Sequence, residues 1–161
     1  MSPAGSIQAI VDASTRIADS FTTRYYTAAD LAPLERAQQL PTFYAPTARI
    51  SWNGNPIGAD ALAAFAQSLP ESVHEVQAFD CHPVSGSAAG SNPPSLVVTV
   101  SGQVSHGSNP TPSAGSINSK NFDNLPRVFS QSFILVFSEE AAATGRGEQG
   151  YLVASDSFRF C

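Results

Sequence analysis

The sequence offers few side chains that could perform acid–base chemistry together. Asp80 and His82 stand two positions apart in the segment DCHPV, and Tyr25 and Tyr26 are adjacent. A carboxylate or an imidazole can act as a general base, and a tyrosine hydroxyl as an acid, when an apolar cavity brings them together. The turn after Trp52 reads WNGNPIG and lacks the nucleophile of a G-x-S-x-G motif. These four side chains are therefore the candidates for a catalytic site.

The histidines and cysteines do not form a metal-binding pattern. His74, His82 and His106 lie on predicted strands and in a loop, with no i, i+4 pairing and no cysteine at ligand spacing. Cys81 and Cys161 lie in predicted strands and are typical of buried, reduced structural thiols. The sequence therefore predicts no metal and no cofactor.

Composition and charge argue against a nucleic-acid-binding protein and against a membrane-spanning one. Charged residues make up 13% of the 161 residues, and the net charge is -5. The seven arginines are scattered and Lys120 is the single lysine, so no basic patch favours nucleic-acid binding by this chain alone. No leader pattern opens the sequence, and aliphatic or aromatic runs such as FILVF are too short to cross a membrane. We expect a soluble protein that is not secreted.

Three helices are predicted in the first half of the chain. The longest carries an apolar stripe at helical spacing, formed by Ile7, Ile10, Val11, Ile17, Ala18, Phe21 and Tyr25. A shorter helix begins at Pro33 and ends before Pro41. The third covers residues 59–69, where four apolar residues recur at i, i+3, i+4 and i+7: Leu62, Phe65, Ala66 and Leu69.

The pair Asn53-Gly54 is a hairpin signal, because it stands between alternating apolar residues. The helix predicted directly afterwards favours another interpretation. In it, a strand with Ile50 and Trp52 on one face runs through a turn into the helix. A hairpin is therefore not expected here.

Four long strands are predicted in the second half, at about residues 72–84, 94–105, 127–139 and 150–160. Turn-forming residues separate them, and the longest spacer, at about 105–126, is predicted to be a flexible loop. Helices followed by strands indicate an α+β fold, in which three helices pack on one face of a strongly bent antiparallel sheet. The length suits a single domain over residues 1–161.

The last two predicted strands carry apolar residues on both parities. In residues 127–139, Ile134 and Val136 alternate with Phe133 and Leu135. In residues 150–160 one parity holds Leu152, Ala154, Phe158 and Phe160, and the other holds Tyr151 and Val153. A sheet face that meets water should instead be polar. We therefore expect something apolar to cover the second face of the sheet.

Seven short blocks resemble one protein family when they are taken in order along the chain. They are YY at 25–26, WNGN at 52–55, LP at 69–70, DCHPV at 80–84, VVTVSGQV at 97–104, SQSFIL at 130–135 and ASDSFRF at 154–160. Together they resemble the small, nuclear transport factor 2-like subunit of the general mRNA export receptor, the fungal mRNA transport regulator 2 type. The segment 105–126 is longer than in the short animal relatives, so contacts carried by that loop are the least transferable.

The resemblance implies a cone-shaped α+β fold with no enzymatic activity. It implies an obligate heterodimer, formed through the sheet, with the nuclear transport factor 2-like domain of the large nuclear RNA export factor. Such a heterodimer carries mRNPs, and in fungi pre-ribosomal particles, through the nuclear pore. It also implies contact with phenylalanine–glycine nucleoporins through the heterodimer, and shuttling between nucleus and cytoplasm.

The predicted strand at 72–84 supplies the centre of the expected partner site. Asp80 has the parity opposite to Phe79, so it is expected to point out of the sheet among small apolar neighbours. The resemblance implies that an arginine of the large subunit pairs with this carboxylate, whereas the residues alone also allow a solvated surface aspartate. The predicted partner-binding residues are Val76, Ala78, Asp80, His82, Ile134 and Val136.

Asp156 shares its parity with Phe158 and Phe160. Aspartates in such positions often bond to nearby backbone or hydroxyl groups. A local hydrogen bond is therefore expected for it.

Two other functions remain open from the sequence. Folds of this cone type also serve isomerases and dehydratases, but a catalytic Asp80 would have to point into the cone, against its predicted orientation. Nuclear transport factor 2 itself is a homodimeric import carrier for a small GTPase. The blocks WNGN, DCHPV and SDSFRF favour the export relative over it.

Overall fold

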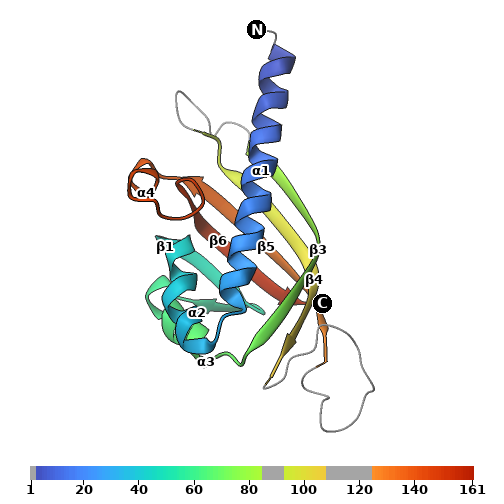
Figure 1. Ribbon diagram of the computed structural model, residues 1–161, viewed down its shortest axis with the longest axis vertical. Coiled ribbons are helices and arrows are strands. Elements are labelled where there is room, and N and C mark those ends of the chain that lie inside the picture. Colours follow the sequence, from blue (N-terminus) through green and yellow to red (C-terminus); the bar gives the residue numbers. More distant parts are fainter. Residues whose placement is uncertain (1–2, 85–92, 108–124) are drawn as a thin grey trace.

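A long helix, α1 (Pro3–Ala29), lies along one face of a curved sheet in the computed structural model (Figure 1). The structure describes residues 3–84, 93–107 and 125–161, with side chains from residue 7 onward. Helices α2 (Pro33–Gln39) and α3 (Leu62–Ser68) follow, each next to a short 3-10 turn, at Leu40–Phe43 and Ala59–Ala61. The three predicted helices are confirmed. In the described part of the chain, no helix is long and apolar enough to span a membrane.

The apolar stripe of α1 divides into a buried and an exposed part. Ala18, Phe21 and Tyr25 are buried against the sheet, and Phe21 packs edge-on against Phe133 with ring centroids 5.0 Å apart. Nearer the beginning of the helix, Ile7 remains 63% exposed. The stripe therefore holds the second half of α1 on the sheet and continues beyond it.

Within the described residues, the sheet has six strands in the order β2-β1-β6-β5-β4-β3. Their bounds are β1 Tyr44–Trp52, β2 Asn55–Ile57, β3 Ser72–Pro83, β4 Leu96–His106, β5 Arg127–Phe137 and β6 Tyr151–Phe160. Neighbouring strands are antiparallel, except that β1 and β6 pair in parallel. The α+β class and the four long strands are as predicted, whereas the purely antiparallel sheet is not, because β6 returns beside the first strand.

Asn53 and Gly54 form a hairpin turn, contrary to the expectation from the sequence. Both residues have positive φ, 49° and 82°, as a type I′ turn requires. Trp52 pairs with Asn55 across the turn, and β1 pairs antiparallel with β2. β2 has only three residues, too few to show the alternation typical of a strand. The helical pattern of the residues that follow is therefore the stronger signal in the sequence.

A fourth helix, α4 (Glu139–Thr144), occupies a segment expected to be a loop. The Ser138 hydroxyl accepts a hydrogen bond from the Ala141 amide at 3.2 Å, and Gly145 ends the helix with φ 71°. A serine N-cap and a glycine just after the last turn are helix signals in the sequence. The loop predicted at about 105–126 lies mostly in residues 108–124, which are outside the described part.

A β-bulge in β3 changes which side chains share a face. The register with β4 shifts between Val76 and Ala78, so Gln77 is the extra residue. Val76 therefore turns toward α1 and packs against the core, and its predicted place on the other face is wrong. A Cβ on Gly102, opposite the bulge, would lie 2.0 Å from the Glu75 carbonyl oxygen, so glycine permits this close approach.

A second bulge lies in β6. The register with β5 shifts between Val153 and Ser155, which leaves Ala154 as the extra residue. Leu152 pairs with Val136 on the face away from α1, while Phe158 faces the core. The predicted single parity for Leu152 and Phe158 is therefore wrong.

Candidate functional site

The sheet face away from α1, called here the outer face, carries a row of small polar side chains. Adjacent strands pair these residues directly, so the row crosses five strands from β3 to β1. Each of them is exposed or half-buried. The polar row consists of Asp80, Thr99, Ser132, Ser157 and Ser51.

An apolar patch lies beside the polar row. Val97 pairs with Ile134, and Val136 follows two positions later on β5. Ile134 and Val136 are 41% and 40% exposed, although aliphatic side chains are usually buried. We call Val97, Ile134 and Val136 the apolar patch.

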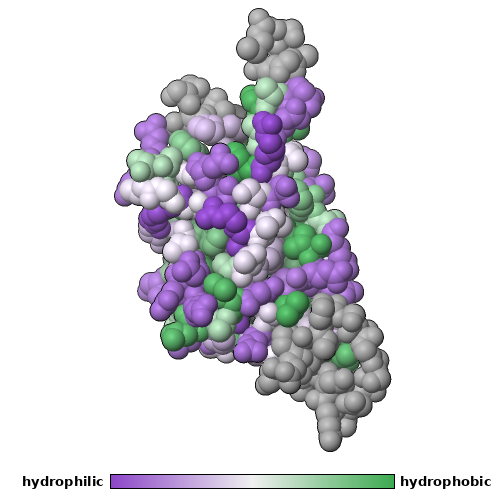
Figure 2. Space-filling model, in the orientation of Figure 1, coloured by the Kyte–Doolittle hydropathy of each residue, from purple (hydrophilic) through white to green (hydrophobic). Residues whose placement is uncertain are grey.

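Charges on the outer face are separated by strand. Asp80 and Glu75 stand exposed on β3, at one edge of the sheet, whereas Arg159 on β6 and Arg49 on β1 stand exposed toward the other edge. The side that carries α1 differs: it is covered largely by hydrophilic or weakly polar residues, with strongly hydrophobic ones in separate small spots (Figure 2). The outer face thus combines exposed aliphatic residues with acidic side chains on the edge strand β3 and arginines on the interior strands β6 and β1.

The predicted partner-binding residues are placed on this face with one exception. Ala78, Asp80, His82, Ile134 and Val136 are all exposed on it. As described above, Val76 is not. Sequence reasoning did not find the remaining members of the polar row or Arg159. Their alternation along each strand was visible, but their alignment depends on the register between strands.

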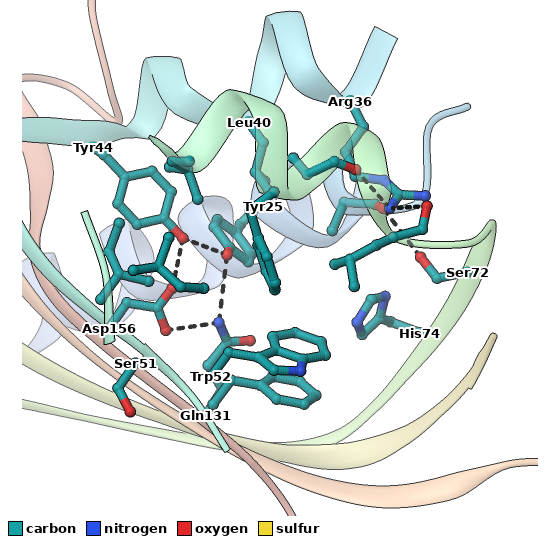
Figure 3. A pocket seen from close by; sticks show the side chains of 18 of the residues that line it. Tyr25, Arg36, Leu40, Tyr44, Ser51, Trp52, Ser72, His74, Gln131 and Asp156 are labelled. Carbon is teal, nitrogen blue, oxygen red and sulfur yellow. Dashed lines mark hydrogen bonds between the residues drawn. The ribbon is translucent and has the colours of Figure 1, made fainter. Parts of the chain in front are cut away.

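A cavity lies on the other side of the sheet, beneath α1, α2 and α3 (Figure 3). Its volume is about 50 Å³, enough for a few water molecules. Among its lining residues are Tyr25, Tyr44, Gln131, Asp156, Trp52, His74 and His106. Trp52 stacks on Phe158 with ring centroids 4.1 Å apart and forms one wall.

Asp156 lies at the inner end of this cavity and bonds to distant residues. Its Oδ2 accepts a hydrogen bond from the Tyr44 hydroxyl at 2.6 Å, and its Oδ1 accepts one from Gln131 Nε2 at 2.8 Å (Figure 3). The expected local hydrogen bond is therefore wrong. Burial raises the pKa of Asp156 to about 6, although hydrogen bonds from Tyr44, Gln131 and Tyr25 act in the opposite direction.

Two histidines line the cavity, His74 near the start of β3 and His106 at the end of β4. His74 Nδ1 lies 2.5 Å from Asp30 Oδ1, and Ser72 also donates to that oxygen. Burial lowers the pKa of His106 to about 4, and the neighbouring His74 adds to this effect. His106 is therefore neutral at physiological pH.

The four residues named for a catalytic site are not brought together. Tyr25 lines the cavity and Tyr26 is buried beside it, whereas Asp80 and His82 point away from the sheet on the outer face. A general base at Asp80 cannot reach a substrate held under α1. Cys161 is exposed beyond β6, contrary to the expected buried thiol, and Cys81 is half-buried.

Arg36 is a buried cation that ties α2 to the end of α3. It is 2% exposed and donates to the carbonyl oxygens of Ala66, Leu69 and Pro70 at 3.1, 3.3 and 2.8 Å. Figure 3 shows Arg36 at the rim of the cavity. Burial lowers the pKa of the Arg36 guanidinium, while nearby carboxylates act in the opposite direction. A guanidinium keeps its charge under these conditions, so Arg36 supplies donors that the last turn of α3 lacks.

Comparison with known proteins identifies the family. The model of the family described as nuclear pore RNA shuttling protein Mtr2 matches residues 12–132. The chain belongs to the Mtr2 family. Among curated relatives, NTF2-related export protein 2 of Bos taurus is 33% identical over 162 residues, covering 99% of this chain and 96% of that protein.

Solved structures show that this Mtr2-family chain has an NTF2-like fold. A chain in the complex of the Chaetomium thermophilum Mex67 NTF2-like domain with Mtr2 aligns with a TM-score of 0.68 at 19% identity, covering 92% of this chain and 98% of that one. A putative scytalone dehydratase from Novosphingobium aromaticivorans aligns with a TM-score of 0.65 at 10% identity, covering 96% and 88%. This enzyme shares the fold alone. The Mtr2 family is one of export factors, not of enzymes.

Proposed function

We propose that this chain is the small, non-enzymatic subunit of a heterodimeric mRNA export receptor. Its outer face binds the NTF2-like domain of a large export factor of the Mex67 type, and the heterodimer carries mRNPs through the nuclear pore. Contact with phenylalanine–glycine nucleoporins, pre-ribosomal cargo and shuttling between nucleus and cytoplasm belong to the same proposal. Family membership and a related Mex67–Mtr2 complex support it.

The observation that carries the proposal is the apolar patch beside the polar row. Aliphatic side chains such as Ile134 and Val136 gain free energy when a partner removes them from water, at about 25 cal/mol per Å². The small hydroxyl side chains of the polar row let a second sheet approach closely, because they hold little volume above the strands. A face with such short side chains suits packing against another sheet.

The separated charges indicate the chemistry of the partner. Asp80 and Glu75 on β3 fit a cationic surface, and Arg159 with Arg49 fits an acidic one. Such complementarity increases the association rate and sets the orientation of the two domains more than it adds affinity. We therefore expect one relative orientation of the two sheets, with a cation of the partner over Asp80.

The test is a binding measurement between the purified chain and the NTF2-like domain of the large export factor from the same organism. Ser132→Arg places a long cation at the centre of the polar row and should abolish a 1:1 complex in calorimetry and size-exclusion chromatography. The matched control, Thr23→Arg, lies exposed on α1 and should bind normally. Normal complex formation by Ser132→Arg would overturn the proposed interface. A stable homodimer with no affinity for this domain would favour an import carrier instead.

We also expect the chain alone to self-associate with increasing concentration, because the apolar patch is left in water. In sedimentation velocity, the double variant Ile134→Thr, Val136→Thr should shift association to about tenfold higher concentration, since less apolar area is buried. Leu34 is 62% exposed on α2, away from the sheet, so Leu34→Gln serves as the control. Self-association that only Leu34→Gln reduces would contradict the role of the patch.

A further inference from the structure

Two chains of hydrogen bonds converge in the core. In the first, the Tyr26 hydroxyl donates to Gln131 Oε1 at 2.8 Å. Gln131 Nε2 then donates to Asp156 Oδ1 at 2.8 Å. Because the amide oxygen already accepts from Tyr26, the amide nitrogen is the group that faces the carboxylate. This chain therefore runs from α1 through β5 to β6.

The second chain reaches the other carboxylate oxygen. The Tyr44 hydroxyl donates to Asp156 Oδ2 at 2.6 Å, which uses its only proton. The Tyr25 hydroxyl lies 2.6 Å from that of Tyr44 and must be the donor in this pair. Tyr25 in turn accepts a longer bond from Gln131 Nε2 at 3.4 Å. This chain runs from α1 through β1 to β6.

We propose that Asp156 is a proton-sensitive centre of the core, at which two directed hydrogen-bond chains from α1 end, and that proton uptake there reverses one of them. The ionised carboxylate accepts from both chains, so every hydroxyl and amide proton has an acceptor. This proposal does not depend on the proposed function, which gives no role to Asp156 or to its hydrogen bonds.

Protonation of Asp156 changes the bonding of the tyrosines in a defined way. The new O–H cannot donate to Gln131 Nε2, which has no lone pair, so it donates to the Tyr44 oxygen. Tyr44 then donates to Tyr25, and the Tyr25 proton loses its acceptor. Tyr25 lines the cavity, so this proton turns toward it (Figure 3). Proton uptake in the core thus presents a hydroxyl donor to the cavity.

The surroundings of Asp156 favour proton uptake near pH 6. The titratable groups that face it are Tyr25 and Tyr26 from α1 and Tyr44 from β1, and the β5 side contributes the neutral Gln131. Burial raises the pKa of each of these tyrosines, so they remain neutral. Burial also raises the pKa of Asp156 from 3.8 to about 6. The carboxyl proton is therefore the one that exchanges first.

The sign of the resulting pH dependence is opposite to that of most aspartates. Because the folded-state pKa is the higher one, this group stabilises the fold at low pH, and that contribution is lost as pH rises through about 6. Between about pH 7.5 and about pH 5, the folding equilibrium constant should increase about tenfold from this group alone. A surface aspartate gives no such increase.

The experiment follows the Cγ resonances of ¹³C-labelled aspartate in the full chain by NMR and measures unfolding across the same pH range. We expect Asp156 to titrate near pH 6, and Asp156→Asn to remove the stabilisation at low pH. The control is Asp19→Asn, an exposed position on α1, where unfolding across this pH range should match that of the wild type. Tyr44→Phe removes a donor to the ionised form and should move the Asp156 midpoint upward.

A midpoint for Asp156 near the ordinary value of about 4 would overturn the proposal. So would an unchanged pH dependence of unfolding in Asp156→Asn. If that variant fails to fold, the Tyr44→Phe midpoint decides, because it keeps the carboxylate: an unchanged midpoint would show that the second chain does not end on Asp156.

Discussion

Replacing Asp80 with arginine should weaken binding to the large export factor more than replacing it with alanine. Asp80 is exposed on β3 and makes no hydrogen bond or ion pair within the described residues, so its carboxylate is free for a partner. If a cation of the partner covers it, Asp80→Ala leaves that cation buried and unpaired, at a cost of about 2 to 5 kcal/mol. This corresponds to roughly thirty-fold to several-thousand-fold in affinity. Asp80→Arg adds repulsion between two cations.

The measurement is the dissociation constant of the purified heterodimer at one fixed salt concentration, with circular dichroism to confirm folding. Asp19 is an exposed aspartate on α1, and Asp19→Arg makes the same charge change away from the outer face. It should leave the affinity near the wild-type value. Equal affinities for the wild type, Asp80→Ala and Asp80→Arg would place Asp80 in solvent and remove the proposed ion pair.

Replacing Arg36 with methionine should produce the largest loss of stability. Methionine fills a similar volume but leaves the carbonyl oxygens of Ala66, Leu69 and Pro70 without these donors. Unsatisfied buried acceptors and lost bonds to a charged donor together cost about 3 to 5 kcal/mol. The melting temperature should fall by about 6 to 20 °C.

Thermal and denaturant unfolding of Arg36→Met measure this loss. The control is Arg16→Met, because Arg16 is exposed on α1 and its substitution should change stability by less than about 0.5 kcal/mol. Arg36→Lys keeps a charge but offers a single nitrogen, so it should fall between the two. A stability of Arg36→Met close to that of Arg16→Met would show that water replaces the guanidinium at α3.

The helices and long strands could be predicted because their patterns are local. The stripe from Ala18 to Tyr25 shows a helical period, and the runs in β4 and β5 show the residues of strands. The hairpin at Asn53 and Gly54 also had a local signal, which was overruled by the helix after it. Ser138 and Gly145 mark α4 in the same local way, as its N-cap and as the glycine after its last turn.

The features that could not be predicted from the sequence depend on the register between strands. Simple alternation assigned Val76 to the face of Asp80, but a single extra residue in β3 reverses every side chain before it. The polar row likewise exists only because Thr99 lies opposite Ser132, and Ser132 opposite Ser157. Nothing in the separate strands fixes these pairs.

The Asp156 network was out of reach for the same reason. Tyr44 and Asp156 stand 112 positions apart, and Gln131 comes from another strand. The expected local bond was reasonable for an aspartate between two serines. Asp156 is instead buried by Phe158 and by α1. A buried carboxylate accepts hydrogen bonds from whichever donors the fold brings to it.

The parallel pairing of β1 with β6 bears on how the protein is made. A ribosome delivers β1 well before β6, so β1 lacks its parallel neighbour in the sheet until β6 has emerged. During that time Tyr25 and Tyr44 have no carboxylate to bond, and β1 has only the three residues of β2 beside it. Contacts between such distant segments also slow folding, since a long loop must close before they form. The core therefore stays incomplete from the emergence of β1 until that of β6, and protection by chaperones matters most in this interval.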